Sequence, residues 1–119
     1  MKLKDYGMNK KATDIIKHLL DEDFNYDKTI AELDELRIRY RQQQDEDNAN
    51  NAWAIITIVG IHRDFRKVYS MLKDRQYYDA WCLMEQIEIG VANLLRNFKG
   101  VENTVKYISV IVRQLQSLY

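Results

Sequence analysis

The fold is decided by the stretch Ala80-Trp-Cys-Leu-Met-Glu-Gln-Ile-Glu-Ile-Gly-Val-Ala-Asn-Leu-Leu-Arg-Asn-Phe98. Its apolar residues recur in alternating steps of four and three, which places them on one face of a helix. The segments before and after it repeat this spacing, so we predict three consecutive helices that pack through heptad-like seams. The seams are Ile55, Ile58, His62, Phe65, Tyr69 and Leu72; Ala80, Met84, Ile87, Val91, Leu94 and Phe98; and Val101, Val105, Ile108, Val112, Leu115 and Tyr119.

The first half of the chain shows two shorter helical patterns, which a polar stretch separates from the seams. The second of these helices is predicted to begin after Asp27, a residue type that caps helix N-termini. The stretch over 42–51 reads Gln-Gln-Gln-Asp-Glu-Asp-Asn-Ala-Asn-Asn and has no apolar anchor, so we expect an exposed loop there. The two apolar stripes are Met8, Ala12, Ile15, Leu19 and Phe24, and then Ile30, Leu33, Leu36 and Tyr40.

The composition favours the same fold class. The 119 residues include no proline and four glycines, whereas average usage would supply about six prolines and about eight glycines. Because both residue types interrupt helices, their scarcity predicts a chain that is nearly all helix. We predict an all-α, up-and-down antiparallel bundle of four to five helices. It forms a single domain over residues 1–119, a length sufficient to bury a core.

The sequence lacks several features that mark secreted and membrane proteins, and this indicates the cellular compartment. Residues 1–11 are charged and polar, and they lack the apolar segment of a secretory signal. The longest apolar run, 52–61, is far shorter than the span of about 20 residues that crosses a membrane. Cys82 is the only cysteine, so no intrachain disulfide can form and a reducing compartment suits the chain. We therefore predict a cytoplasmic protein that does not enter a membrane.

No set of residues has the spacing of a catalytic or metal site. Neither His18 nor His62 stands three residues after a glutamate, as di-iron bundles require. Cys82 lies within a helical pattern among apolar neighbours, where cysteine is typically a small buried hydrophobe. We predict no metal, no cofactor and no catalytic residue. An enzyme is the least supported alternative, and it would need a closed pocket lined by His62, Glu85 or Glu88.

Two of the helices carry more apolar surface than one seam explains. Tyr78, Cys82 and Ile89 form a second stripe on the helix over 77–98, and the last helix has a second stripe of its own. Such a helix is either a central helix ringed by the others or a surface that binds a second subunit. We therefore predict a homo-oligomer, such as a dimer, or a complex with a partner protein. The interface candidates are Tyr78, Trp81, Cys82, Ile89, Tyr107, Ile111 and Leu118.

The charges balance in total but are unevenly distributed. The 18 basic and 18 acidic side chains cancel, which excludes bulk binding of polyanions. Residues 13–35 carry eight acidic side chains and two lysines. A later basic group predicts, as an alternative function, contact with an acidic partner such as the phosphate backbone of a nucleic acid; a solvated basic face is the simpler interpretation. The group is Arg63, Arg66, Lys67, Lys73 and Arg75.

Several stretches resemble the helical N-terminal part of a group of uncharacterised bacterial proteins. They are Arg63-Asp-Phe65, Tyr77-Tyr-Asp-Ala-Trp-Cys-Leu-Met-Glu-Gln-Ile-Glu-Ile89, Asn97-Phe98 and Gln114-Leu-Gln-Ser-Leu118. Proteins of that group look as if they continue into a Cys/His-rich segment similar to SEC-C-type motifs, which is implied to bind zinc. This sequence lacks that segment. Its apolar pattern is still running at Tyr119, which fits either a fragment of a longer polypeptide or a terminal turn that docks on a partner.

The resemblance implies no activity for residues of this chain. The observations together lead us to expect a non-catalytic helical module for protein interaction or oligomerisation, within a larger bacterial protein. Association with nucleic acid through the basic group is the alternative.

Overall fold

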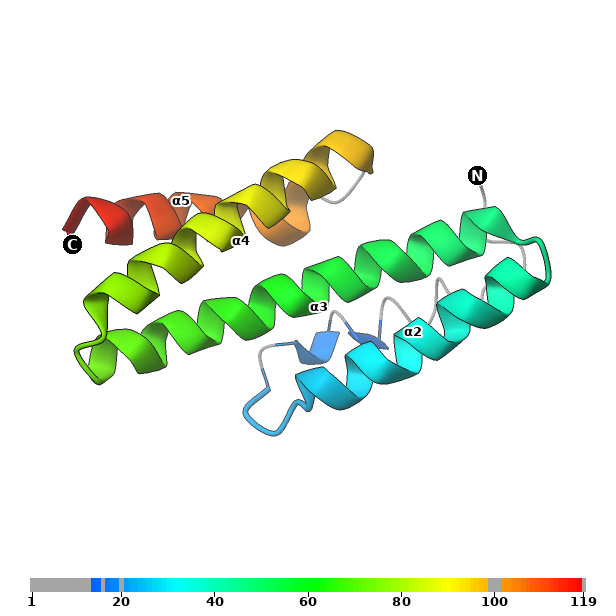
Figure 1. Ribbon diagram of the computed structural model, residues 1–119, viewed down its shortest axis with the longest axis horizontal. Coiled ribbons are helices and arrows are strands. Elements are labelled where there is room, and N and C mark those ends of the chain that lie inside the picture. The colour runs from blue at the N-terminus through cyan, green and yellow to red at the C-terminus, as the bar shows by residue number, and fades with distance from the viewer. Residues whose placement is uncertain (1–13, 16, 20, 99–101, 119) are drawn as a thin grey trace. The chain divides into compact units, whose positions relative to one another are not determined.

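The computed structural model describes residues 14, 15, 17–19, 21–98 and 102–118, with the backbone alone at 102–104, 106 and 107. Four helices are defined within these residues: α2 (Tyr26–Gln42), α3 (Glu46–Lys73), α4 (Tyr77–Asn97) and α5 (Glu102–Leu118) (Figure 1). The described part of the chain contains no strand. The prediction of an all-α helical bundle is therefore confirmed.

The chain divides into two compact units, residues 1–60 and residues 61–119. The boundary lies inside α3, a continuous helix of 28 residues. The sequence gives no sign of this boundary, because the apolar seam of α3 continues across Gly60 without a break. The single domain over residues 1–119 stays a prediction.

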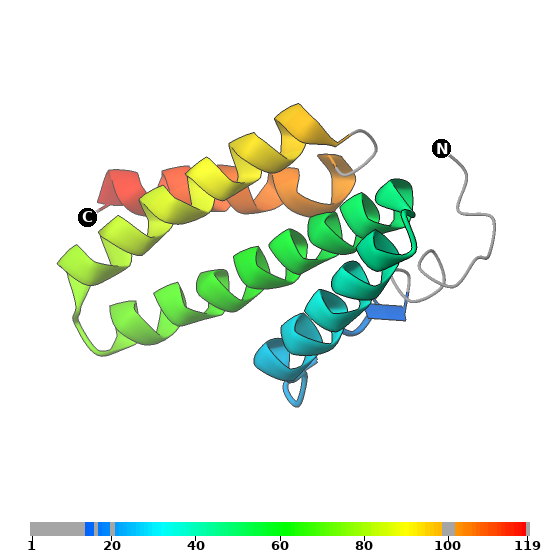
Figure 2. The same cartoon turned by 45° about the vertical axis from the view of Figure 1, so that its right-hand side comes forward.

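In the first unit, α2 runs antiparallel to the first half of α3 (Figure 2). Its core contains Leu33 and Ala52, both fully buried, and Ile58, which is 1% exposed. The Tyr26 hydroxyl donates a hydrogen bond of 2.6 Å to the carbonyl oxygen of Leu19, which connects the segment before α2 to its first turn. Of the predicted first stripe, Met8 and Ala12 lie outside the described residues.

The first helix boundary differs from the prediction by two residues. Asn25 is the N-cap of α2, and its side chain accepts a hydrogen bond of 2.9 Å from the backbone N–H of Lys28. Asp27, the predicted cap, lies instead in the first turn, where its negative charge is favourable near the positive end of the helix dipole. Asparagine and aspartate are both good caps, so residue type alone could not choose between them.

The predicted exposed loop over 42–51 is wrong. Only residues 43–45 connect α2 to α3, and residues 46–51 form the first turns of α3. Asp45 accepts hydrogen bonds from the backbone N–H and the side-chain Nδ2 of Asn48, at 3.2 and 2.8 Å. Asn48 is 3% exposed and Ala49 is fully buried. The polar run therefore carries its own cap and a small buried anchor, which a search for large apolar residues overlooks.

The turns at the two ends of α3 have the same geometry. Gln44 and Arg75 lie in the left-handed region, with φ of 60° and 62°. Each donates its backbone N–H to the carbonyl three positions earlier, at 3.0 and 3.1 Å, and the next residue donates to the carbonyl five positions earlier, at 2.8 Å in both turns. This is the Schellman arrangement that ends a helix. The charged stretch 74–76 thereby ends α3 and connects it to α4.

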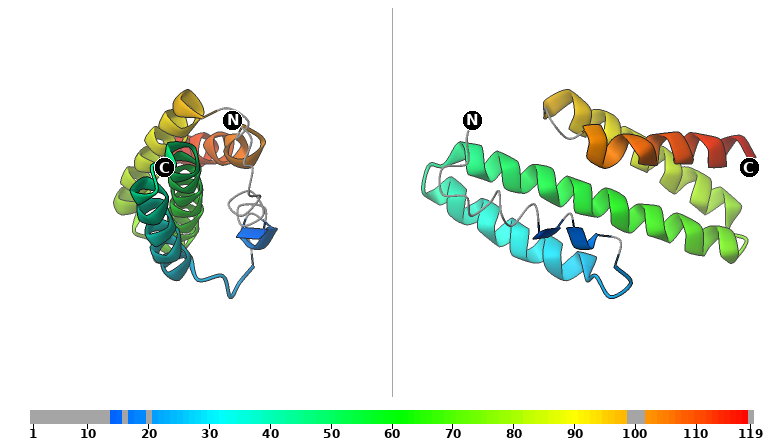
Figure 3. Two further views of the ribbon diagram at one scale, coloured as in Figure 1. Left: turned by 90° about the vertical axis from the view of Figure 1, so that its right-hand side faces the viewer. Right: turned by 180° about the vertical axis from the view of Figure 1, so that it is seen from behind.

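In the second unit, α4 and α5 lie side by side and antiparallel (Figure 3). The second half of α3 packs on α4, since the Ile61 side chain lies 3.5 Å from the place a Cβ would occupy on Gly90. The predicted seam of α4 is confirmed, with five members buried: Ala80, Met84, Ile87, Val91 and Leu94. The described seam of α5 is also buried at Val105, Ile108 and Val112, while Val101 and Tyr119 lie outside the described residues.

The seam of α3 departs from the prediction towards its end. Tyr69, a predicted seam residue, is 48% exposed, whereas the neighbouring Val68 is fully buried. Val68 follows Ala54 and Ile61 at intervals of seven residues, and all three are buried. The buried face at the end of α3 therefore continues this neighbouring row, which lies one position before Ile55, His62 and Tyr69.

Candidate functional site

One face of α4 is both apolar and open to solvent. It comprises seven residues, which we call the outer face of α4, and it lies on the side of the helix opposite the buried seam. Tyr78 is 80% exposed, Ile89 is 52% exposed and Trp81 is 37% exposed. The outer face consists of Tyr78, Trp81, Cys82, Glu85, Ile89, Ala92 and Arg96.

The exposure of Tyr78 and Ile89 decides between the two interpretations of the second stripe on α4. A central helix ringed by other helices would bury both side chains, and the structure leaves both largely in solvent. Cys82 is half-buried between them. The stripe is therefore a surface of the described chain and is free to meet another molecule.

The residues in the second stripe of α5 differ in their solvent exposure. Leu118 is 74% exposed, Ile111 is half-buried, and the side chain of Tyr107 lies outside the described residues. The structure adds Val110, which is 51% exposed, and Tyr77 at the start of α4, which is 43% exposed. Neither residue was among the predicted interface candidates.

Tyr78 stays uncharged at neutral pH. A side-chain hydrogen bond with Cys82 raises the pKa of the Tyr78 hydroxyl above its ordinary value of 10.0. Electrostatic interaction with Cys82 acts in the same direction, and the carboxylates of Asp79 and Glu85 add to it. The hydroxyl is therefore a neutral polar group at the end of an exposed aromatic ring, a combination common at protein interfaces.

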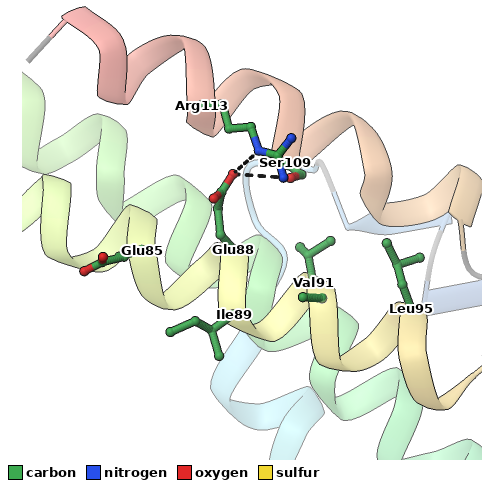
Figure 4. A pocket seen from close by; sticks show the side chains of 8 residues that line it. Glu85, Glu88, Ile89, Val91, Leu95, Ser109 and Arg113 are labelled. Carbon is green, nitrogen blue, oxygen red and sulfur yellow. Dashed lines mark hydrogen bonds and ion pairs between the residues drawn. The ribbon is translucent and has the colours of Figure 1, made fainter.

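A groove of about 370 Å³ adjoins the outer face, between α4 and α5 (Figure 4). Oε1 of Glu88 accepts hydrogen bonds from Nε of Arg113 at 2.9 Å and from the hydroxyl of Ser109 at 3.3 Å. The Glu88 side chain is 25% exposed and that of Arg113 is 74% exposed. The groove is lined by Glu85, Glu88, Ile89, Val91, Ala92, Leu95, Ser109 and Arg113.

Among the described side chains that line the groove, Glu85 and Glu88 supply carboxylates and Arg113 supplies a guanidinium. None of these described lining side chains is a histidine, cysteine or lysine. Glu88 is held by two donors, and Glu85 lies exposed at the side (Figure 4). This arrangement suits the binding of a cationic group beside an apolar wall, and it offers no nucleophile with an adjacent base. Of the three residues that we expected to line an enzyme's pocket, Glu85 and Glu88 line this groove and His62 does not.

The predicted basic group does not form a uniform positive surface. Nε of Arg63 donates to a carboxylate oxygen of Asp64 at 3.3 Å, and both side chains are partly buried. Arg66 is half-buried, while the three remaining members, Lys67, Lys73 and Arg75, are exposed. Asp74 separates the last two in the sequence. Nucleic-acid association through this group stays the alternative hypothesis.

The first unit has a smaller pocket of about 270 Å³, lined by Asp14, Ile15, His18, Phe24, Thr29 and Glu32. Nδ1 of His18 lies 2.7 Å from a carboxylate oxygen of Asp21. His62, in the second unit, is 4% exposed. Within the described ranges, no group of three histidine, cysteine or acidic side chains is placed to hold a metal ion. No helix in the same ranges has both the length and the apolar character that crossing a bilayer demands.

Comparisons of the chain with protein-family models, with curated proteins and with solved structures gave no match. The geometry of the outer face of α4 and of the adjoining groove is therefore the basis for a functional assignment.

Proposed function

We propose that this chain is a non-catalytic helical module that associates with a second copy of itself through the outer face of α4. The observation that carries the proposal is the exposure of Tyr78 and Ile89, at 80% and 52%, on a helix whose opposite side is already the core of its unit. Aromatic residues such as Tyr78 and Trp81 dominate the binding energy of many interfaces. We further propose that the module works within a longer cytoplasmic protein of bacterial origin, as the sequence resemblance implies.

The energetics favour a symmetric arrangement. Full burial of a large apolar side chain is worth roughly 1.5–3 kcal/mol, whereas association costs about 4–15 kcal/mol in lost translational and rotational freedom. A single set of Tyr78, Trp81 and Ile89 only approaches that cost. In a two-fold interface each residue that lies in it contributes twice, once from each copy, so a symmetric pair gains twice the burial of a single face.

Charge also permits self-association. The outer face of α4 contains one acidic residue, Glu85, and one basic residue, Arg96, and therefore has no net charge. Two copies of a strongly charged face would repel each other, whereas two copies of this face do not.

The first experiment measures the molar mass of the chain by sedimentation over a wide range of concentrations. We expect a concentration-dependent dimer, and we expect Ile89→Glu to convert it to a monomer, because the introduced carboxylate would be buried without a partner. Ile38→Glu is the matched control. Ile38 is 46% exposed, similar to Ile89, but it lies on α2 in the other unit. A wild-type chain that stays monomeric throughout, or two variants that behave alike, would refute the proposal.

A further inference from the structure

The two charged residues of the outer face are well separated along α4. Glu85 and Arg96 are eleven residues apart, which corresponds to three helical turns and about 16 Å along the axis. Both side chains are exposed. Ile89 and Ala92, one large and one small apolar residue, lie between them on the same face.

These positions distinguish the two ways in which two α4 helices can pack together. In a parallel, in-register pair, Glu85 would meet Glu85 and Arg96 would meet Arg96, so both contacts would repel. In an antiparallel pair related by a two-fold axis, Glu85 of each copy meets Arg96 of the other. The charges therefore favour the antiparallel pair at both ends.

The apolar residues agree with the same register. When the two-fold axis passes between positions 90 and 91, Glu85 lies opposite Arg96 of the second copy. The same axis places Ile89 opposite Ala92 of the second copy, and Ala92 opposite Ile89. A large side chain then faces a small one twice, which is how facing positions of packed helices fill space. One register thus satisfies Glu85, Arg96, Ile89 and Ala92, and it places Tyr78 and Trp81 past Asn97, the last residue of the partner's α4.

The groove beside the outer face supports this arrangement. Glu85, Ile89 and Ala92 belong to both the outer face and the groove lining, so the surface that meets a second copy is hollowed on one side (Figure 4). Its described lining also contains a second carboxylate, that of Glu85, beside the Glu88 carboxylate that binds Arg113. An arginine from outside fits both properties, because its hydrocarbon stem covers apolar surface and its guanidinium binds carboxylates.

We infer that two copies pair α4 against α4 in antiparallel orientation, and that Arg96 of each copy enters the groove of the other and binds Glu85. This inference rests on the proposed self-association and specifies its geometry. The second copy is the occupant to which the charges point, because the face supplies both members of the ion pair.

The inference is tested by charge reversal. Glu85→Arg and Arg96→Glu should each weaken the dimer by about tenfold, because each replaces two attractive contacts with two repulsive ones. The double variant should restore the dissociation constant to within about threefold of the wild type, and an equimolar mixture of the single variants should form mainly mixed dimers. Gln86→Arg adds the same positive charge at an exposed position outside the outer face, and it should leave the dimer unchanged.

The outcomes separate the inference from the proposed function. If the wild type dimerises and Ile89→Glu abolishes the dimer, but the single variants do not prefer each other, the outer face is the interface and the antiparallel register is wrong. A wild-type monomer would overturn both. Circular dichroism of each variant shows whether the fold is retained. The mixed dimer of the two single variants is a second control, because two misfolded variants would not associate with each other more tightly than each associates with itself.

Discussion

The two turns that bound α3 show how much a single residue contributes to this fold. Gln44 and Arg75 adopt left-handed backbone conformations that favour glycine, and neither is a glycine. The N-caps that follow them differ. Asp45 binds Asn48 through its side chain, whereas Gln76 makes no side-chain capping bond. The backbone hydrogen bonds common to both turns therefore suffice to end one helix and begin the next.

Glycine at either turn should stabilise the protein. We expect Gln44→Gly and Arg75→Gly each to raise the free energy of unfolding by about 0.5–1 kcal/mol, because glycine adopts a positive φ without steric cost. Urea denaturation measures the change. Gln43→Gly is the control, since Gln43 has a φ of −85° and should lose stability when replaced by a more flexible residue. Equal effects at Gln43 and Gln44 would contradict this explanation.

At the scale of the element, α4 has two apolar sides with different roles. Leu94 is fully buried in its seam, whereas Ile89 on the outer face is 52% exposed. We expect Leu94→Ala to lower the free energy of unfolding by about 2–5 kcal/mol, through lost burial and a residual cavity. Ile89→Ala should leave the stability of the monomer nearly unchanged, because alanine has the higher helix propensity and little buried surface is lost.

Both variants are measured by denaturation at a concentration low enough to keep the chain monomeric, and the dimer is then measured separately. If Ile89→Ala destabilised the monomer as much as Leu94→Ala, the outer face would be part of the core. That result would remove the basis of the proposed interface.

The sequence predicted some helices more completely than others. The seam of α4 was predicted residue by residue, because its large apolar side chains keep a regular spacing through a helix of 21 residues. The beginning of α3 was missed because its buried anchors, Ala49 and Ala52, are small and lie among polar residues. The spacing also could not predict the groove. The contact between Glu88 and Arg113 spans 25 residues and depends on how α5 is rotated against α4.

At the scale of the whole molecule, the balanced charge bears on the alternative function. Arg63 pairs with Asp64, and Asp74 lies between Lys73 and Arg75 in the sequence. We therefore expect no detectable binding of DNA or RNA even at about 50 mM salt, where phosphate contacts are strong. Fluorescence anisotropy with labelled oligonucleotides measures this. Binding that falls steeply with salt, and that Arg63→Glu together with Arg66→Glu weakens, would establish the nucleic-acid alternative instead.

The single thiol of the chain has a consequence for how a paired form responds to oxidation. Cys82 lies on the outer face, so a parallel pair would place the two thiols level with each other. In the proposed antiparallel register, the two Cys82 thiols would be about 25 Å apart along the helix axis. A disulfide needs Cα atoms within about 7 Å. The proposed pair would therefore be held by reversible contacts alone, and oxidation would not link the two copies covalently.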